Sequence, residues 1–186
     1  EDAIRWYRRA SGFRLGGFGL ATTSESLFRL AWLLAVTGEY AEAEAMMRRA
    51  LEQGEATEQG VVHLSNLIAA QGRMDEAERV VREWIAGHGA GELSVSEVAK
   101  LMARQRGVGP AEAYLRESVL AYPELHGLSA GVIRAMLGAG RVAQAEALAR
   151  ALVERRPEDG ALLAQRGALL MQVYPPGDAR FGEGVT

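Results

Sequence analysis

An Ala-Glu pair recurs along this chain at a fixed interval of 34 residues, and this period constrains the fold more than any other feature of the sequence. The pair stands at Ala43-Glu44 and again at residues 77–78, 111–112 and 145–146. Four occurrences at one unbroken spacing indicate a structural repeat rather than an alanine-rich composition. Repeat arrays stack supersecondary units of this size, and each unit buries its apolar face against its neighbours.

Each repeat begins with a segment whose apolar residues have helical spacing. In registers that start at residues 24, 58, 92, 126 and 160, apolar or small residues recur at the fourth, seventh, eighth and eleventh positions, which form one stripe along an α-helix. The first register has Leu27, Leu30, Ala31 and Leu34 there. The stripe is less regular in the last two registers, where Ser129 and Arg166 interrupt it. The pattern predicts one amphipathic helix at the start of every repeat.

A glycine follows this first helix in each of the first four registers. Gly38, Gly72 and Gly140 share one register position, and Gly107 stands one residue later. Glycine supplies the left-handed residue that closes a helix, so we expect a second helix to begin directly afterwards. The repeated alanine then permits close approach of the two helices. The repeated glutamate is expected near the helix start with a role in the helix dipole and in solvation, which contributes about a few tenths of a kcal/mol if the side chain is exposed.

These features, together with late prolines at Pro123 and Pro157, resemble the tetratricopeptide repeat. The resemblance implies an all-α fold, a right-handed α-solenoid of antiparallel helix pairs. It covers four repeats and a fifth first helix, at residues 24–57, 58–91, 92–125, 126–159 and 160–174. Ile133 stands where the family has a small residue and Arg106 where it has glycine, so the fourth pair is expected to pack at a slightly different angle.

The two ends of the chain depart from the period. Residues 1–10 are similar to the second helix of a preceding repeat, and their segment "WYRRA" is similar to Sel1-like repeats. The glycine-rich residues 11–23 lack the Gly-Lys-Ser/Thr ending of a phosphate-binding loop, so we expect a bulged connection. The Pro/Gly-rich tail at residues 175–186 is expected to fray. Because position 1 is not Met and the last helix lacks a polar cap, we expect a piece of a longer protein or a processed chain.

Composition limits the kinds of partner and site. The net charge of −3 disfavours a surface that tracks nucleic acid. The absence of cysteine excludes disulfides and thiolate metal sites, but it suits bacterial cytoplasm and periplasm alike. No apolar segment approaches the roughly 20 residues of a membrane helix. Lys100 is the single lysine beside many arginines, which suggests a GC-rich bacterial genome.

The sequence contains no pattern typical of catalysis or metal binding. Its three histidines, His63, His88 and His126, fall in different registers, and no HxxxH, HExxH or nucleophile motif is present. We therefore expect a protein that is not an enzyme and binds neither metal nor cofactor. His88 is expected in a solvated linker, and Trp84 is expected to serve in packing.

By the resemblance, the first helices line a concave groove that binds peptides. The residues that we predict to contact a partner there are Phe28, Trp32, Val62, Asn66, Ser96, Lys100, Arg104 and Arg134. This row changes from aromatic to basic along the chain, so the predicted ligand is a protein segment with an apolar anchor and acidic residues. Asn66 is expected to bond the ligand backbone through both ends of its amide. The family's carboxylate clamp is not expected, because Phe28 and Trp32 occupy two of its positions.

Two other functions stay open from the sequence. Within the same fold, the chain could be a self-assembling scaffold segment, a homo-oligomer in a bacterial envelope or polysaccharide-export machine. From a different class, it could bind RNA, because pentatricopeptide repeats are also helical hairpins with a slightly longer period. The strict spacing of 34 residues and the negative net charge argue against RNA.

Overall fold

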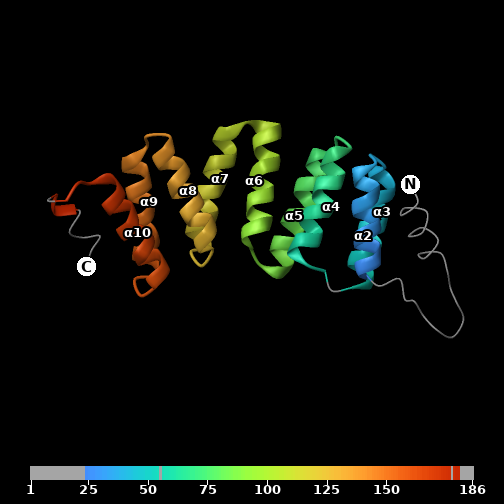
Figure 1. Ribbon diagram of the computed structural model, residues 1–186, viewed down its shortest axis with the longest axis horizontal. Helices are drawn as coiled ribbons and strands as arrows, with labels where there is room; N and C mark the ends of the chain where they lie inside the picture. Colours follow the sequence, from blue (N-terminus) through green and yellow to red (C-terminus); the bar gives the residue numbers. More distant parts are fainter. Residues whose placement is uncertain (1–23, 55, 177, 181–186) are drawn as a thin grey trace, which may run out of the picture. The chain divides into compact units, whose positions relative to one another are not determined.

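The computed structural model describes residues 24–54, 56–176 and 178–180, and none of these lies in a β-strand (Figure 1). The described chain consists of α-helices joined by short turns, which confirms the all-α prediction. The helices are α2 (Ser24–Val36), α3 (Tyr40–Gln53), α4 (Glu58–Ala70), α5 (Met74–His88), α6 (Glu92–Arg106), α7 (Val108–Ala121), α8 (His126–Gly138), α9 (Val142–Arg155) and α10 (Gly160–Val173). The helix expected over residues 1–10 and the connection at 11–23 lie outside the described residues.

The period of the sequence reappears in the positions at which the helices begin. The helices α2, α4, α6, α8 and α10 begin at residues 24, 58, 92, 126 and 160, each 34 residues after the one before. The helices between them, α3, α5, α7 and α9, begin at residues 40, 74, 108 and 142, with the same interval. A residue and its counterpart 34 positions later therefore occupy the same place in equivalent helices.

The interhelix glycines adopt the left-handed backbone that the sequence predicts. Gly38, Gly72, Gly107 and Gly140 have φ values of 83°, 81°, 90° and 72°. After Gly72, the backbone N–H of Arg73 donates to the carbonyl of Ile68 at 3.3 Å. The backbone N–H of the residue after Gly38, and that of the residue after Gly140, likewise donate to the carbonyl five residues earlier. Such a bond across a left-handed residue closes a helix and lets the next one start at once.

Residues up to Gln105 and residues from Arg106 onward form two compact units. In the first unit the predicted stripe faces the core, and all four of its residues in α2 are buried. The core of this unit joins α2, α3, α4 and α5 to α6 through side chains that include Leu34, Met47, Leu64, Ile68 and Leu101. In the second unit, Val132, Met136, Leu148, Leu152 and Leu162 are buried.

The repeated alanines are buried as predicted, but the expected solvated role of the repeated glutamate is wrong for Glu44 and Glu78. All four alanines, at positions 43, 77, 111 and 145, are buried. Glu44 and Glu78 are buried beside them, and Glu78 accepts a hydrogen bond from Arg82 at 2.7 Å. A buried carboxylate needs partners, because an uncompensated charge in the interior is costly.

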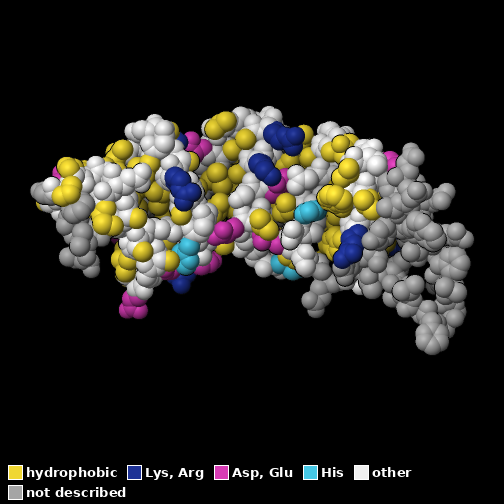
Figure 2. All heavy atoms as spheres, viewed as in Figure 1, with side chains coloured by type: hydrophobic (Ala, Val, Ile, Leu, Met, Phe, Trp, Pro, Cys, Tyr) yellow, Lys and Arg dark blue, Asp and Glu magenta, His cyan; other side chains and the backbone are white. Residues whose placement is uncertain are grey.

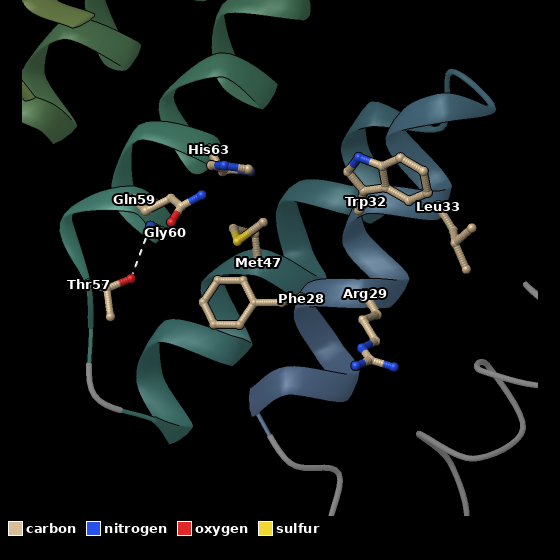
Figure 3. A pocket seen from close by; sticks show the side chains of 9 residues that line it. All are labelled: Phe28, Arg29, Trp32, Leu33, Met47, Thr57, Gln59, Gly60 and His63. Atoms are coloured by element: carbon tan, nitrogen blue, oxygen red, sulfur yellow. Dashed lines mark hydrogen bonds between the residues drawn. The ribbon is translucent and has the colours of Figure 1, made fainter. Parts of the chain in front are cut away.

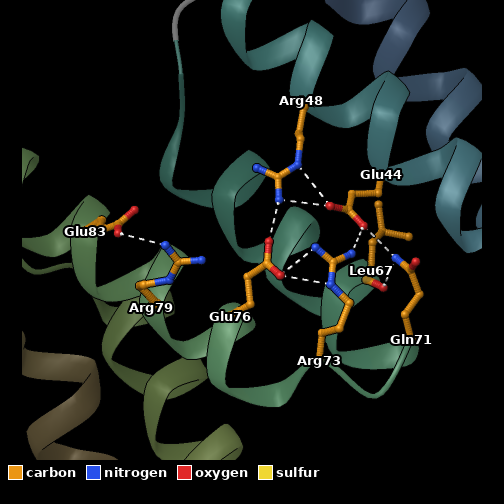
Figure 4. A network of polar contacts seen from close by, with 8 residues as sticks. All are labelled: Glu44, Arg48, Leu67, Gln71, Arg73, Glu76, Arg79 and Glu83. Carbon is orange, nitrogen blue, oxygen red and sulfur yellow. Dashed lines mark hydrogen bonds and ion pairs between the residues drawn. The ribbon is translucent and has the colours of Figure 1, made fainter.

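Glu44 has its partners in the next repeat as well as in its own (Figure 4). Its Oε2 accepts from Nε2 of Gln71 and from Nη1 of Arg73, both at 2.7 Å, and its Oε1 accepts from Nε of Arg48 at 3.0 Å. Arg48 and Arg73 both also bind Glu76. The network joins α3 to the turn between α4 and α5 and to the first turn of α5.

Equivalent contacts join repeats in the second unit. Glu112 pairs with Arg141, which is 29 residues further along the chain, as Arg73 is from Glu44. Glu146 accepts from the hydroxyl of Tyr174, 28 residues further along. The repeated glutamate therefore links one repeat to the next at these three positions, which we call the glutamate ladder.

A second set of polar contacts joins equivalent first helices. In the first unit, Oε1 of Glu58 at the start of α4 accepts from the backbone N–H of Ser94 at 2.8 Å, in the first turn of α6. In the second unit, Nε2 of His126 at the start of α8 lies 2.9 Å from Oδ2 of Asp159. Asp159 caps α10, since its Oδ1 accepts from two backbone N–H groups. The hydrogen bond from His126 holds the pKa of Asp159 below its ordinary value.

One minor expectation is corrected at the end of α5. His88 is the last residue of this helix rather than part of a loop, and its ring stacks on that of Trp84 with a centroid separation of 3.7 Å. The two residues are four positions apart, so they lie on the same face of the helix.

Candidate partner-binding site

The predicted partner residues of the first unit lie on its first helices α2, α4 and α6. The ninth register position is exposed in every case, at Trp32, Asn66 and Lys100. Trp32 is unusual among them, because 60% of its surface is accessible to solvent. On the face that Figure 2 shows, hydrophobic side chains gather over α2 and α4, and basic side chains lie over α6.

A pocket of about 620 Å³ lies beside Trp32, between α2, α3 and α4. Figure 3 shows the ring of Phe28 reaching from α2 toward α4, with Met47 of α3 between them. The lining is largely apolar on the side of α2 and α3 and polar at the start of α4. Its residues are Phe28, Arg29, Trp32, Leu33, Met47, Thr57, Gln59, Gly60 and His63. We call this hollow the Trp32 pocket.

Gly60 explains how Phe28 comes so close to α4. A Cβ atom at this glycine would lie 2.8 Å from Cδ2 of Leu51 and 3.1 Å from Cζ of Phe28. Contacts this short force neighbouring side chains to move. Gly60 also donates its N–H to Oγ1 of Thr57 at 3.1 Å, so the cap of α4 forms the adjoining wall. The absence of a side chain at Gly60 thus leaves room for an aromatic ring against the backbone of α4.

A second hollow of about 400 Å³ lies on another side of Trp32. It shares Trp32, Met47 and His63 with the first pocket and adds the predicted residues Val62 and Asn66. Tyr40, at the start of α3, also lines it. The structure therefore brings together four predicted residues, Phe28, Trp32, Val62 and Asn66, around two adjacent hollows.

Sequence reasoning missed Met47, Tyr40 and His63 as parts of this site. Met47 and Tyr40 belong to α3, whereas the prediction concerns first helices only. For His63 a signal is present, because it stands three residues before Asn66 and such a spacing places two residues on one helix face. From the sequence, His63 is considered only as a metal ligand.

Asn66 has less freedom than predicted. Its Nδ2 donates to the carbonyl of Val62 at 2.8 Å, within its own helix. A ligand that uses the amide nitrogen must therefore compete with this bond.

The predicted basic residues of α6, Lys100 and Arg104, line neither hollow. Nζ of Lys100 bonds Oε2 of Glu97 at 2.7 Å, and Glu97 is buried while Lys100 is exposed. An ammonium group has three donors, so this bond leaves two for a ligand or water. Ser96 and Arg104 are exposed on the same helix. Arg134 is exposed on α8 and belongs to the second unit.

Within the described residues, no group of three or more histidine, aspartate or glutamate side chains could hold a metal ion. Among the helices that these residues form, none has the length and apolar character that crossing a membrane requires.

No protein-family model matches this sequence, and no curated protein matches it either. Solved structures do resemble it. YrrB, described as a TPR protein with an unusual peptide-binding site, aligns with 98% of this chain and 92% of its own at 12% identity, with a TM-score of 0.48. A thermophilic TPR protein from Thermus thermophilus aligns with 88% of this chain and 87% of its own at 16% identity, with a TM-score of 0.45.

The likeness is better for the C-terminal part of a TPR repeat-containing protein from Cytophaga hutchinsonii. That structure aligns with 91% of this chain at 9% identity, with a TM-score of 0.55. The alignment covers 65% of that solved chain. At such low identity the likeness concerns the fold alone. The chain has the all-α tetratricopeptide-repeat fold that its 34-residue period predicts.

Proposed function

We propose that the protein is a non-enzymatic interaction module that binds an extended segment of a partner protein. An apolar or aromatic side chain of that segment enters the Trp32 pocket. The observation that carries this proposal is a large, mostly exposed tryptophan at the edge of an apolar pocket of about 620 Å³. Single exposed apolar residues are common on proteins, but an exposed aromatic beside a concave apolar surface is a frequent feature of binding sites.

Two physical effects support an aromatic or apolar anchor. Phe28 and Met47 offer apolar surface that a ligand side chain would remove from water. Trp32 loses little conformational entropy on binding, because its side chain has only two rotatable bonds, and tryptophan is enriched among interface hot spots. The second hollow, lined by Val62, gives room for a neighbouring ligand residue.

The basic residues of α6 favour a segment that also carries acidic residues. Lys100 and Arg104 are exposed on a first helix of the same unit. Exposed charges of this kind mainly raise the association rate, and salt screens their effect. Arg134 of α8 is a separate proposal, a basic contact for an acidic residue on the second unit.

The experiment that tests the proposal is selection of random twelve-residue peptides on the immobilised chain, followed by calorimetric titration of the selected peptides. We expect peptides with an aromatic or large apolar residue near acidic residues. Trp32→Ala should weaken binding by about 2 kcal/mol or more, the usual size of a hot-spot effect. Changing Lys100, Arg104 or Arg134 to Ala should weaken binding mainly at low salt.

Trp84→Ala is the matched control, because Trp84 lies on a second helix and stacks on His88 outside the pocket. This variant should bind as the unmodified chain does. If Trp84→Ala weakens binding while Trp32→Ala does not, the site lies on the second helices and the proposal is wrong.

A further inference from the structure

One wall of the Trp32 pocket carries two polar side chains that make no hydrogen bond within the described part of the chain. Gln59 and His63 both line the pocket, and both are exposed to solvent. They stand four residues apart on α4, so they lie on one face of the helix. Neither the amide of Gln59 nor the ring of His63 has a partner among the described residues. Both can therefore bond a ligand without giving up a contact within the protein, unlike Asn66.

The other walls of the pocket are mainly apolar. Phe28 of α2 and Met47 of α3 line them, and Met47 is buried. Figure 3 shows Gln59 and His63 pointing from α4 toward the side of the pocket where Phe28 and Met47 lie. A phenylalanine ring and a thioether both make favourable contacts with a further aromatic ring. A ligand side chain in this pocket therefore meets apolar atoms on one side and hydrogen-bonding groups on the other.

This combination of walls fits an aromatic ring that ends in a group able both to donate and to accept hydrogen bonds. The amide of Gln59 offers donors and an acceptor, and a neutral histidine ring such as that of His63 offers one of each. A phenol hydroxyl can donate to one of these side chains and accept from the other. The indole of a tryptophan has only a donor, and a phenylalanine ring has neither group.

We propose that the Trp32 pocket selects tyrosine as the anchor residue of the partner segment, and that Gln59 and His63 determine this specificity. The inference rests on the proposed function, because it names the side chain that enters the same pocket. The tyrosine ring packs on Phe28 and Met47. Its hydroxyl bonds Gln59 and His63, and a phenylalanine in its place loses these bonds while keeping the apolar contacts.

Two libraries of twelve-residue peptides test the anchor. One has tyrosine and the other phenylalanine fixed at the sixth position, and every other position is random. Peptides selected from each library on the immobilised full chain are titrated by calorimetry beside a counterpart in which the fixed residue alone is exchanged, tyrosine for phenylalanine or the reverse. We expect the tyrosine form of each pair to bind about fivefold more tightly, the usual net contribution of a hydrogen bond.

Two substitutions and a matched control assign this preference to α4. Gln59→Leu and His63→Leu should each bring the affinity of the tyrosine form closer to that of the phenylalanine form. Gln53→Leu makes the same change as Gln59→Leu at an exposed position of α3 that does not line the pocket, so it should keep the full preference. Because the two peptides are compared on the same variant, a general loss of folding would weaken both and would not change their ratio.

The outcomes separate this inference from the proposed function. Equal affinity of the two forms, with binding lost in Trp32→Ala, would leave the proposed function standing and overturn the tyrosine anchor. A tyrosine preference that both Gln59→Leu and His63→Leu retain would overturn the role of these residues. If neither library yields a binder, or Trp32→Ala binds as the unmodified chain does, the proposed function fails and the inference fails with it. Self-association of the chain that the tyrosine peptides disrupt would place a second copy in the pocket, and would overturn the partner segment.

Discussion

At the scale of single residues, Ser65 has a buried hydroxyl that the described part of the chain leaves without a hydrogen-bond partner. An unpaired buried hydroxyl costs free energy, and alanine also has the higher helix propensity. Ser65→Ala should therefore raise the free energy of unfolding by about 1 kcal/mol. Urea unfolding followed by circular dichroism measures this change.

Ser129 provides the opposite case for comparison. It is equally buried, but its Oγ lies 2.9 Å from Oε1 of Gln165 and 3.0 Å from the carbonyl of His126. Ser129→Ala should lower the free energy of unfolding by about 1 kcal/mol, because it leaves Gln165 without this donor. Destabilisation of equal size by both substitutions would contradict the assignment of Ser65.

The packing role of the alanine in the repeated pair can also be tested by substitution. Ala77 is completely buried in the core of the first unit. Ala77→Leu should lower the free energy of unfolding by about 1–3 kcal/mol, the usual cost of overpacking. Ala86→Leu, at an exposed position of the same helix, should have little effect in the same urea titration. Similar effects at the two positions would show that helix packing around Ala77 is loose.

The repeated glutamate shows which contacts cannot be predicted from the sequence around a single residue. The period places Glu44 near a helix start, which favours an exposed side chain on local grounds alone. Its partner Arg73 is 29 residues away, and no local pattern connects the two. Likewise Phe28 and Trp32 were predictable from their register position, whereas Met47 enters the pocket from the neighbouring helix.

At the scale of helices, the Glu44 network predicts a pH dependence. Burial raises the pKa of Glu44, but hydrogen bonds from Gln71, Arg48 and Arg73 outweigh this effect, so the pKa lies below its ordinary value of 4.5. A carboxyl group with a lowered pKa stabilises the folded state above its unfolded-state pKa, and this contribution is lost as the pH falls through the folded-state pKa.

Glu44→Gln removes the charge and with it this dependence. Between pH 7 and about pH 3, the unmodified chain should lose more of its unfolding free energy than the variant does. Urea unfolding at a series of pH values measures both curves. Glu52→Gln, at an exposed position of the same helix, is the matched control and should keep the dependence. Parallel curves for Glu44→Gln and the unmodified chain would show that the network does not stabilise the fold.

The helices themselves were largely predictable, because their signals are local. The apolar stripe of α2 and the left-handed glycines after α2, α4 and α8 all have the positions that the sequence indicates. The contacts between equivalent helices were not predictable. The bond from Ser94 to Glu58 spans 36 residues, and it depends on how two repeats stack.

At the scale of the whole molecule, oligomeric state separates the proposed peptide receptor from a self-assembling scaffold. We expect a monomer by light scattering at micromolar concentration, because a receptor must keep the Trp32 pocket open to its ligand. A mass that rises with concentration, and that Trp32→Ala returns to the monomer value, would instead show that a second copy of the chain occupies this surface.

Net charge leads to a further prediction for the whole chain. With a net charge of −3, it should not retain single-stranded RNA in a filter-binding assay at about 150 mM salt. Affinity of this kind comes mainly from basic residues that neutralise phosphates. Retention that falls steeply with added salt would contradict the prediction and favour an RNA-binding function.

The glutamate ladder has a consequence for how such a chain can change by gene duplication. Each of its contacts depends on a fixed number of residues between partners in successive repeats, 29 for Glu44 and Arg73. A tandem copy of residues 58–91 would place an Arg73 equivalent 29 residues after Glu44 and another 29 residues after the first Glu78. Inserting one residue between Glu44 and Arg73 would instead shift the arginine away from its acceptor. Recombination between whole repeats therefore preserves this contact, whereas a change in the length of a single repeat breaks it.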